Sequence, residues 1–371
     1  MRVAFCGGGT GGHVYPALTV AAALRREAER QGTPLELLYI GVRGKIDAEL
    51  VAREGIPFEA VAAGPLRSRS VAGTASGMFK LMAGFVQSLR LLRGFRPDAV
   101  FATGGYGSVG VGLAAKALGL PLLLFLPDVE AGLAVKALVR VASRIAVTVA
   151  PALAAMPAHK TALTGYPVRP GFFGIDRVAA RRALGLQPDL PVLLVTGGST
   201  GASRINRAVA SRLPDYLANG QLLHVSGQND YDWLVTQRAA LAQDLQSRYQ
   251  LYPYLHDEMA PALGAADLAV MRAGASTLGE LPAARLPAIL VPGDFSDQDD
   301  NARYLESEGA AVVLPEARLD SLFDTIAALT TDHARLDRMR TNLERLAQPE
   351  AAEHLAGVLM DLAADRPRVA A

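Results

Sequence analysis

Two glycine-rich loops, one in each half of the chain, constrain the fold more than any other feature of the sequence. The first, GGGTGGH at residues 7–13, follows the apolar run 3–5, and the second, GGSTGA at residues 197–202, follows the apolar run 192–195. Each loop opens an amphipathic segment. A strand, a glycine turn and a helix in this order direct backbone N–H groups and the positive end of a helix toward an anion. Two copies about 190 residues apart predict two similar α/β domains that bind phosphate in the cleft between them.

The composition indicates a folded protein of two domains without a general affinity for nucleic acid. The 371 residues are long for one hydrophobic core, and half of them are apolar. The formal net charge of +1 provides no basic field for nucleic acid. Cys6 is the only cysteine, so no intrachain disulfide can form, and we expect a buried thiol in a reducing compartment. We find neither a signal peptide nor an apolar run of about 18 residues that would span a bilayer.

Strand and helix patterns alternate through both halves of the sequence. Besides the first apolar run, strands of the first half are expected at 35–40, 57–62, 99–103, 121–126, 144–149 and 161–164. Strands of the second half are expected at 192–196, 222–226, 251–254, 268–271, 288–291 and 310–313. This alternation predicts doubly wound parallel sheets, whose ligands bind beyond the carboxyl ends of the strands.

Prolines and glycines at residues 165–171 mark the expected linker between the two domains. We therefore place an N-terminal domain at 1–164 and a C-terminal domain at 165–348. A final helix at 349–371 is expected to return to the N-terminal domain. Pro16 is expected near the first position of the first helix, where its missing N–H has no cost.

The segment MRAGASTLGE at residues 271–280 leaves an expected strand, turns on glycine and begins a helix at Ser276 or Thr277. The hydroxyl and N–H groups of these two residues either cap the helix or bind phosphate. Glu280 either accepts hydrogen bonds from a ribose diol or serves as the partner in an ordinary capping box. The first glycine loop has neither the dinucleotide-binding pattern nor that of a Walker loop.

His13 directly follows the first glycine loop. An imidazole at the mouth of a phosphate loop can act as a general base near neutral pH, although most histidines are surface or core residues. The triplet DQD at 297–299 is the metal–nucleotide signal of some glycosyltransferases. Its context favours an ordinary polar loop in which Gln298 and Asn301 face the cleft. No His or Cys cluster has metal-site spacing, and no metal or cofactor is expected.

Apolar residues recur at helical spacing between residues 77 and 96, with Lys and Arg in and around the segment. The pattern is typical of an amphipathic helix packed on its own sheet. It is equally typical of a helix face that enters an anionic membrane interface.

Taken together, these motifs resemble the MurG family of glycosyltransferases over nearly the whole chain. The shared motifs are GGTGGH at 8–13, GGY at 104–106, GYPVR at 165–169, GGSTGA at 197–202, RAGAST at 272–277 with Glu280, and Gln298 with Asn301. The family moves N-acetylglucosamine from UDP-N-acetylglucosamine to undecaprenyl-diphospho-N-acetylmuramoyl-pentapeptide. Its fold, GT-B, has two Rossmann-like domains that face each other across a cleft.

The resemblance implies roles for individual residues. In the C-terminal domain, Leu255 would present its backbone to uracil, Glu280 would bind the ribose hydroxyls, and the loop around Ser199 would bind phosphate. The acceptor diphosphate would lie at Gly104, Gly105 and Tyr106. The membrane-associating surface would include Phe79, Met82 and Phe85. The full set of residues implied to contact the donor is Thr10, Gly11, Gly12, Asp128, Arg169, Ser199, Leu255, Ala275, Ser276, Thr277, Leu278, Gly279, Glu280, Gln298 and Asn301.

The mechanism implied by the resemblance follows from charge. Cleavage of the sugar–phosphate bond builds negative charge on UDP, which helix N-termini stabilise. His13 is the candidate base that takes the proton from the acceptor 4-hydroxyl, and a single displacement would invert the anomeric centre. The resemblance places such an enzyme on the cytoplasmic face of the cell membrane, bound peripherally to an anionic surface, in peptidoglycan synthesis.

One segment departs from the family pattern. Where the family usually carries His-Glu-Gln-Asn, this chain has FLPD at residues 125–128. An ionised Asp128 accepts hydrogen bonds but cannot donate them, and it adds negative charge near a diphosphate. Two alternatives stay open. One is a related GT-B enzyme with another lipid acceptor such as diacylglycerol, and the other is a catalytically degenerate, membrane-associated binding protein.

Overall fold

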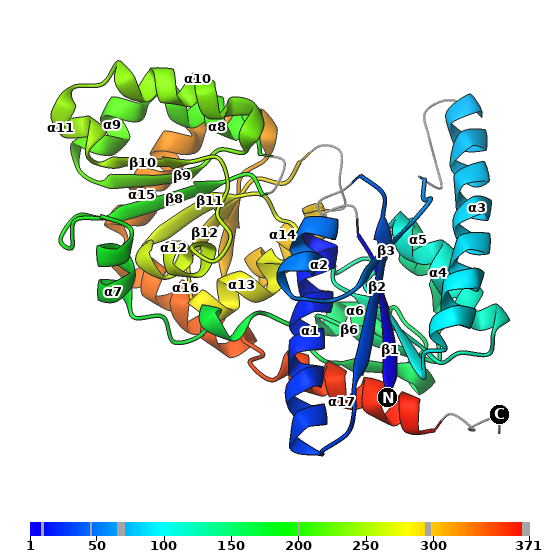
Figure 1. The fold of residues 1–371 in the computed structure, drawn as a ribbon. Coiled ribbons are helices and arrows are strands. Elements are labelled where there is room, and N and C mark those ends of the chain that lie inside the picture. The colour runs from blue at the N-terminus through cyan, green and yellow to red at the C-terminus, as the bar shows by residue number, and fades with distance from the viewer. Residues whose placement is uncertain (9–10, 45–46, 65–70, 199–200, 294–297, 366–371) are drawn as a thin grey trace. The chain divides into compact units, whose positions relative to one another are not determined.

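The computed structural model describes residues 1–8, 11–44, 47–64, 71–198, 201–293 and 298–365. The chain divides into two compact units (Figure 1). The first unit contains Met1–Val168 and Glu350–Ala371, and the second contains Arg169–Pro349.

The first unit is a parallel sheet of seven described strands in the order β3-β2-β1-β4-β5-β6-β7. Its strands are β1 (Arg2–Cys6), β2 (Glu36–Val42), β3 (Phe58–Val61), β4 (Ala99–Ala102), β5 (Leu122–Leu126), β6 (Arg144–Val147) and β7 (Thr161–Leu163). Its helices are α1 (Gly11–Arg30), α2 (Asp47–Arg53), α3 (Val71–Phe95), α4 (Tyr106–Ala117), α5 (Leu133–Val139), α6 (Ala150–Ala154) and α17 (Ala351–Ala364). Helices α1 and α17 pack together, and α17 packs on β4 and β5, while α3, α4 and α5 form a second packed group. The central strands are continuous apolar runs because helices cover them on both faces.

The second unit repeats this plan with six described strands in the order β10-β9-β8-β11-β12-β13, again all parallel. Its strands are β8 (Val192–Thr196), β9 (Gln221–Val225), β10 (Tyr249–Tyr252), β11 (Leu268–Met271), β12 (Ala288–Leu290) and β13 (Ala311–Val313). Its helices are α7 (Arg177–Ala183), α8 (Ser203–Ala210), α9 (Leu213–Ala218), α10 (Gln228–Ala239), α11 (Gln243–Gln246), α12 (Met259–Ala265), α13 (Thr277–Ala284), α14 (Gln298–Ser307), α15 (Leu322–Thr331) and α16 (His333–Leu346). One core joins the sheet to α8, α9, α15 and α16.

Strand order reverses once in each sheet, between β1 and β4 in the first unit and between β8 and β11 in the second. Crossovers leave such a point in opposite directions, so the loops that follow the two central strands separate and leave room for a ligand. Both glycine loops follow the first of these central strands, β1 and β8. The candidate site of each unit is therefore at the carboxyl edge of its sheet.

The prediction that Pro16 lies near the start of the first helix is wrong, because α1 begins at Gly11 and Pro16 lies inside it. A proline in that position cannot donate the helical hydrogen bond to the carbonyl four residues earlier, that of Gly12. The Tyr166 hydroxyl donates to the Gly12 carbonyl oxygen instead, at 3.2 Å. A contact from a distant segment thus satisfies the acceptor that the proline leaves open.

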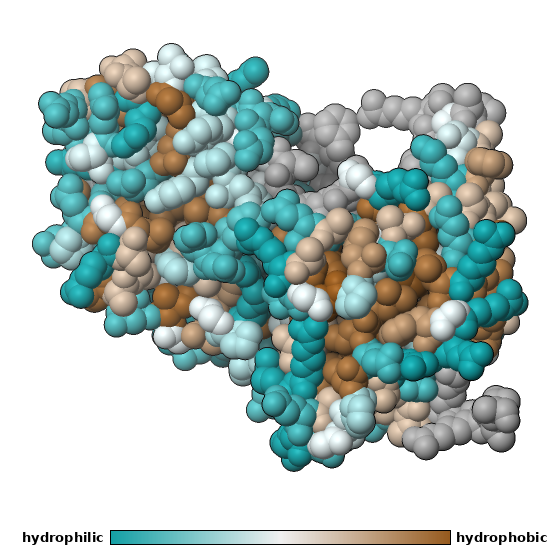
Figure 2. Space-filling view, in the orientation of Figure 1, coloured by the Kyte–Doolittle hydropathy of each residue, from teal (hydrophilic) through white to brown (hydrophobic). Residues whose placement is uncertain are grey.

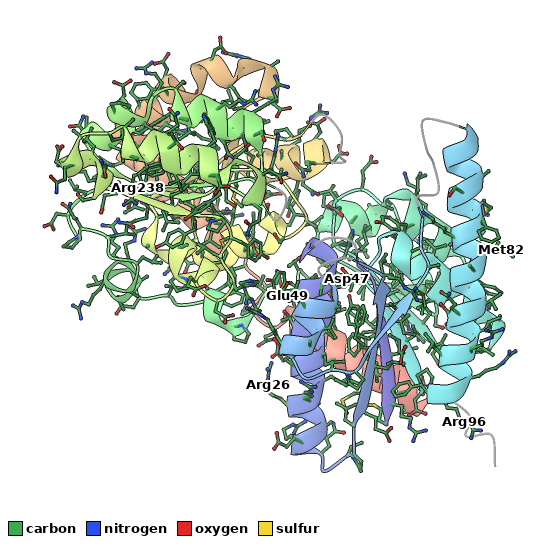
Figure 3. All side chains as sticks on the ribbon, turned by 45° about the horizontal axis from the view of Figure 1, so that its top comes forward. Arg26, Asp47, Glu49, Met82, Arg96 and Arg238 are labelled. Carbon is green, nitrogen blue, oxygen red and sulfur yellow. The ribbon has the colours of Figure 1, made fainter. Side chains whose placement is uncertain are left out.

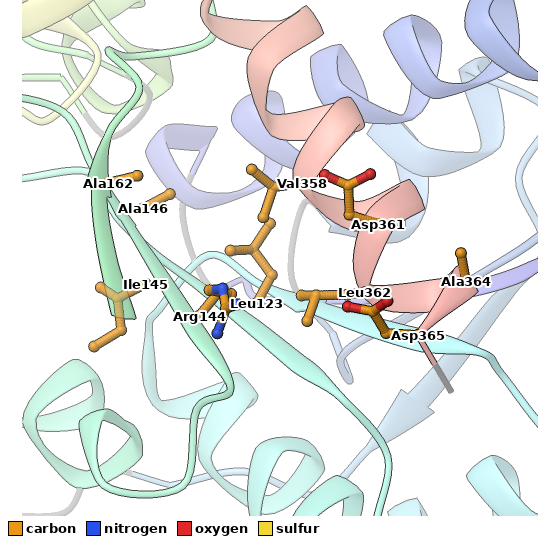
Figure 4. Close-up of a pocket in the computed structure, with 10 residues that line it drawn as sticks. All are labelled: Leu123, Arg144, Ile145, Ala146, Ala162, Val358, Asp361, Leu362, Ala364 and Asp365. Carbon is orange, nitrogen blue, oxygen red and sulfur yellow. The ribbon is translucent and has the colours of Figure 1, made fainter. Parts of the chain in front are cut away.

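A cavity of about 380 Å³ lies between α17 and the strands β5, β6 and β7 (Figure 4). Its charged residues are Arg144, at the first position of β6, Asp361 of α17, and Asp365, which directly follows α17. The cavity lies toward the amino ends of these strands, whereas the glycine loop of the same unit lies at the carboxyl edge. It is therefore distinct from the candidate site.

In the described part of the chain, no helix is both long enough and apolar enough to cross a bilayer.

Candidate active site

His13, in the first turn of α1, is held against the loop that follows β4. Its Nδ1 lies 2.9 Å from the carbonyl oxygen of Thr103, and the Thr103 hydroxyl donates to the His13 carbonyl at 2.6 Å. A carbonyl oxygen only accepts hydrogen bonds, so this contact requires the proton on Nδ1 and leaves Nε2 of the neutral ring as an acceptor. The half-buried imidazole can therefore take a proton through Nε2.

Glycine at two positions lets the loop after β1 lie close to the loop after β4 and to the start of α2. Gly105 has φ of 71°, and a Cβ there would lie 2.7 Å from the Gly8 carbonyl oxygen and 3.3 Å from His13 Cδ2. At Gly8, a Cβ would lie 2.0 Å from the carboxylate of Asp47. Asp47 is fully buried and accepts a hydrogen bond from the Val42 amide (Figure 3). A side chain at Gly105 would displace the loop after β4 from the first glycine loop, and a side chain at Gly8 would displace that glycine loop from Asp47.

The remaining predicted residues of the first unit lie at the same edge. Gly11 and Gly12 begin α1, Gly104 and Gly105 lead into α4, and Tyr106 is its first residue. Asp128 follows β5 and is half-buried. Thr10 lies outside the described residues.

The atypical segment at 125–128 begins inside the sheet. Phe125 is fully buried in β5, with ring contacts to Phe101 at 6.3 Å and to Tyr166 at 6.1 Å between centroids. Because Tyr166 bonds to Gly12, Phe125 packs against a residue that supports the first glycine loop. An apolar ring here supports the loop by packing and offers it no hydrogen bond.

In the second unit, the glycine loop leads from β8 into α8. Gly201 has φ of 76°, and a Cβ there would lie 2.6 Å from the Ser226 carbonyl oxygen. The loop is thus pressed against the segment that follows β9. The N-terminal end of α8 points to the carboxyl edge of the sheet, where its dipole favours an anion. Ser199, the predicted phosphate-binding residue, lies outside the described residues, as does Asp297 of the DQD triplet.

The loop between β11 and α13 brings Ser276 and Glu280 together. The Ser276 hydroxyl donates to Glu280 Oε2 at 3.1 Å and makes no hydrogen bond that caps the helix. A capping box needs the acidic residue at the third helical position, and Glu280 occupies the fourth of α13, so the pair does not form one. Burial raises the pKa of the Glu280 carboxyl above its ordinary value, while the Ser276 hydroxyl and the Arg169 charge act in the opposite direction. Glu280 is half-buried as a residue, and its carboxyl oxygens can accept hydrogen bonds besides the one from Ser276.

Other residues predicted to contact the donor sugar nucleotide support the loop between β11 and α13. Thr277, Leu278 and Gly279 are buried, and the Thr277 hydroxyl donates to the Arg272 carbonyl at 3.2 Å. Asn301, fully buried in α14, donates to the Ala273 carbonyl at 3.0 Å. The structure therefore places the side chains of Thr277 and Asn301 in contact with the loop backbone. Ala275 is half-buried on the same loop.

Gln298 and Arg169 fix the neighbouring loops. Gln298 Oε1 accepts a hydrogen bond from the Gly293 amide at 3.2 Å, which ties α14 to the loop after β12. Arg169 donates to Asp257 Oδ1 at 3.3 Å and to the His256 carbonyl at 3.2 Å. It thereby holds the loop after β10, where Leu255 is buried. In the described residues, no group of three or more His, Cys, Asp and Glu is arranged to hold a metal ion.

Helix α3 exposes an apolar face on the first unit. Phe79 is 76% exposed and Met82, which is labelled in Figure 3, is 57% exposed. Met78 and Val86 are also exposed. In Figure 2 the surface over α3 mixes light brown with teal residues. Phe85 is half-buried. The opposite face of α3 packs closely, since Gly84 and Ser88 are buried against the rest of the unit.

Sequence reasoning did not identify two polar residues of the site. One is Thr103, which hydrogen-bonds to His13, and the other is Glu316, a buried carboxylate that binds two arginines. Both are polar residues shortly after an apolar strand, Thr103 directly after β4 and Glu316 three residues after β13. That position is the signal that could have found them, because it lies at the carboxyl edge of a parallel sheet.

Comparisons with known proteins agree with this architecture. Residues 3–147 match the glycosyltransferase family 28 N-terminal domain, and residues 192–355 match the glycosyltransferase family 28 C-terminal domain. Two doubly wound units with glycine loops at both strand reversals, matched in this order, define a glycosyltransferase with the GT-B fold. The predicted fold class and the predicted hexosyltransferase class are confirmed.

Relatives with curated names identify the family. A protein of Roseiflexus sp. (strain RS-1) is 40% identical over 98% of this chain and 95% of its own length. One of Listeria welshimeri is 37% identical over 98% and 99%. Both are named UDP-N-acetylglucosamine–N-acetylmuramyl-(pentapeptide) pyrophosphoryl-undecaprenol N-acetylglucosamine transferase. The crystal structure of Acinetobacter baumannii MurG matches 97% of this chain and 99% of its own, with a TM-score of 0.71 and 27% identity. The chain belongs to the MurG family.

Proposed function

We propose that this protein is the inverting glycosyltransferase that moves N-acetylglucosamine from UDP-N-acetylglucosamine to the 4-hydroxyl of undecaprenyl-diphospho-N-acetylmuramoyl-pentapeptide in peptidoglycan synthesis. The observation that carries the proposal is the match to relatives with that name at up to 40% identity over 98% of the chain. The polar residues at both carboxyl edges support it, because they suit a nucleotide diphosphate and a proton acceptor.

The second unit binds the donor. The carboxylate of Glu280 accepts hydrogen bonds from the ribose diol, and the backbone at Leu255 faces uracil. The diphosphate lies against the N-terminal ends of α8 and α13, which follow the two central strands. Partial positive charge at these helix ends stabilises the UDP that leaves, since negative charge develops there as the sugar–phosphate bond breaks.

The first unit activates the acceptor. Neutral His13 accepts the proton of the attacking 4-hydroxyl at Nε2, because Nδ1 is engaged by the Thr103 carbonyl. Attack from the face opposite to UDP converts an α-linked donor into a β-linked product in one displacement. The loop of Gly104, Gly105 and Tyr106, which closes around the imidazole, receives the acceptor diphosphate.

We propose that the exposed face of α3 binds the cytoplasmic surface of the cell membrane. Met78, Phe79 and Met82 supply apolar area for the interface, and the exposed cations Lys80 and Arg90 on the same helix suit anionic lipid headgroups. A peripheral enzyme on this surface meets a lipid-linked acceptor without leaving the membrane.

The difference from the usual family pattern at residues 125–128 favours a second candidate function, that of a GT-B enzyme with a diacylglycerol acceptor. Phe125 is buried in the sheet, so it offers no polar atom to a substrate, and ionised Asp128 at the strand end only accepts hydrogen bonds.

Release of UDP from UDP-N-acetylglucosamine, with different acceptors, tests the proposal. We expect release with the lipid-linked muramoyl-pentapeptide and none with diacylglycerol. Other UDP-sugars offered with the same acceptor should react far more slowly. Release with diacylglycerol alone would replace the proposal by the second candidate, and release with neither acceptor would contradict both.

A further inference from the structure

Glu316 binds two arginines at the carboxyl edge of the second sheet. It is the first residue of the 3₁₀ helix η3 (Glu316–Ser321), and its side chain is only 4% exposed. One carboxylate oxygen lies 2.6 Å from Arg272 Nη2, and the other lies 3.1 Å from Arg204 Nη1. Both oxygens are thus engaged with guanidinium groups, an arrangement with strong, directional hydrogen bonds.

Arg272 connects this carboxylate to two loops at the donor site. It follows β11 directly, and its carbonyl accepts the Thr277 hydroxyl at the start of α13. Its Nη1 donates to the carbonyl oxygens of Val291 at 3.1 Å and Pro292 at 3.2 Å, in the loop after β12. One guanidinium therefore joins the loops after β11 and β12 to η3.

Arg204 connects the same carboxylate to the second glycine loop. It is the second residue of α8, the helix that this loop opens. Its Nη2 also donates to the Glu316 carbonyl at 3.4 Å. Through Arg204 and Arg272, Glu316 thus links the segments that follow the two central strands, β8 and β11. The strand order of the sheet reverses between these two strands.

We propose that Glu316 is a positioning residue for the donor diphosphate, acting through Arg204 and Arg272 to hold the N-terminal ends of α8 and α13 in one fixed arrangement. The inference rests on the proposed donor site. Backbone N–H groups stabilise an anion fully only when they are fixed before it arrives. The carboxylate itself does not contact the diphosphate, because both of its oxygens face arginines and its negative charge would repel the ligand.

The charge of the cluster supports this assignment. Two guanidinium groups and one carboxylate leave a net charge of +1 at an edge that receives an anion. Without Glu316, the two arginines would repel one another and lose a fixed partner. Each would then take other orientations, and the loops that they hold would separate.

A double-mutant cycle on UDP binding tests the proposal. Isothermal titration of UDP and of uridine is measured for the full-length chain and for Glu316→Gln, Arg204→Gln and the double variant. We expect each single substitution to weaken UDP about tenfold, within the range for residues of one salt-bridge network. Uridine, which lacks the diphosphate, should bind as before. Arg204→Gln should have no further effect in the Glu316→Gln background.

Controls separate this role from a general loss of structure. Glu344→Gln removes an exposed ion pair with Arg285 in the same unit and should leave both affinities unchanged. Arg204 is 55% exposed, so Arg204→Gln keeps the fold and supports the test even where Glu316→Gln fails to fold. With that variant alone, the expected result is weaker UDP and unchanged uridine.

Several results would overturn the inference. Equal losses for UDP and uridine would indicate a structural role, and additive losses in the cycle would show that Arg204 acts independently of Glu316. Unchanged UDP affinity in the Arg204→Gln variant would show that the contact between Arg204 and Glu316 does not position the diphosphate. If the unchanged protein fails to bind UDP, the proposed donor site itself is wrong, which is a different outcome.

Discussion

A single imidazole, that of His13, carries the proton-transfer step of the proposed mechanism. We predict that His13→Ala lowers turnover about 10²–10⁴-fold, the usual contribution of a general base. UDP binding should persist, because the residues proposed to bind uracil and ribose, Leu255 and Glu280, lie in the second unit. His13→Asn is the matched control, since its amide nitrogen can still donate to the Thr103 carbonyl but offers no basic nitrogen. It should be as slow as the alanine variant, and normal turnover in either would remove His13 from the role.

Single residues were predictable where a motif fixes their spacing. Ser276 and Glu280 lie four residues apart at a helix start, so the sequence predicts their proximity, and the structure places their side chains in contact. The hydrogen bond between Thr103 and His13 joins residues that are 90 positions apart, and only the pairing of β1 with β4 brings them together. No local pattern contains that pairing.

At the scale of secondary-structure elements, a buried polar network ties β9 and β10 to α8. His224 Nδ1 lies 2.9 Å from the Tyr249 hydroxyl, and His224 Nε2 lies 2.9 Å from Asn206 Oδ1. Asn206 Nδ2 in turn donates to Asp230 and to the Ser226 carbonyl. Burial lowers the pKa of His224 to about 3, although the Asp230 charge acts in the opposite direction. The imidazole is therefore neutral in the folded protein.

This network predicts how stability depends on pH. The unfolded chain takes up a proton on His224 near pH 6.5, whereas the folded chain does not until about pH 3. Folding is therefore favoured above pH 6.5 and loses up to about 1.4 kcal/mol for each pH unit below it. Unfolding of His224→Gln, followed by calorimetry between about pH 7 and pH 5, should show a shallower dependence than the parent. The exposed His333→Gln control should keep the parent slope, and an equal slope in all three proteins would refute the assignment.

Most elements were predictable from the alternation of apolar runs and helical patterns. All the expected strands are present, with ends that differ by two residues at most, because both faces of the sheets are covered and their strands are continuous apolar runs. Pro16 is the instructive exception. Its place inside α1 depends on the Tyr166 hydroxyl, which comes from a segment 150 residues further along the chain. Local propensity at Pro16 cannot include such a contact.

At the scale of the whole molecule, the repeated strand–glycine turn–helix pattern indicated two Rossmann-like units, and this fold class is confirmed. The order of strands in each sheet was not predictable residue by residue, since it depends on pairing between distant segments. Likewise, the helical spacing at residues 77–96 is equally compatible with a helix packed on its own sheet and with a helix face that enters a membrane interface. The structure shows that Met78, Phe79 and Met82 are exposed, which the spacing alone does not reveal.

The exposed face of α3 predicts binding to anionic membranes. Combined Phe79→Ser and Met82→Ser should weaken binding to phosphatidylglycerol vesicles at least about tenfold, because each side chain contributes roughly 1–2 kcal/mol of apolar burial. Co-sedimentation measures this loss, while turnover of a soluble acceptor should be unchanged. Val178→Ser, an exposed apolar residue on α7 of the second unit, is the control. Equal vesicle binding by all these proteins would exclude α3 as the membrane surface.

Hydrogen–deuterium exchange with and without UDP tests most directly whether the nucleotide binds at the carboxyl edge of the second sheet. We predict that UDP slows exchange of the peptides covering 253–258 and 271–280, whose backbones would face uracil, ribose and diphosphate. The peptide covering 144–146, beside the α17 cavity, should exchange as before. Protection absent from both of the first two peptides, or confined to other regions of the chain, would contradict the account.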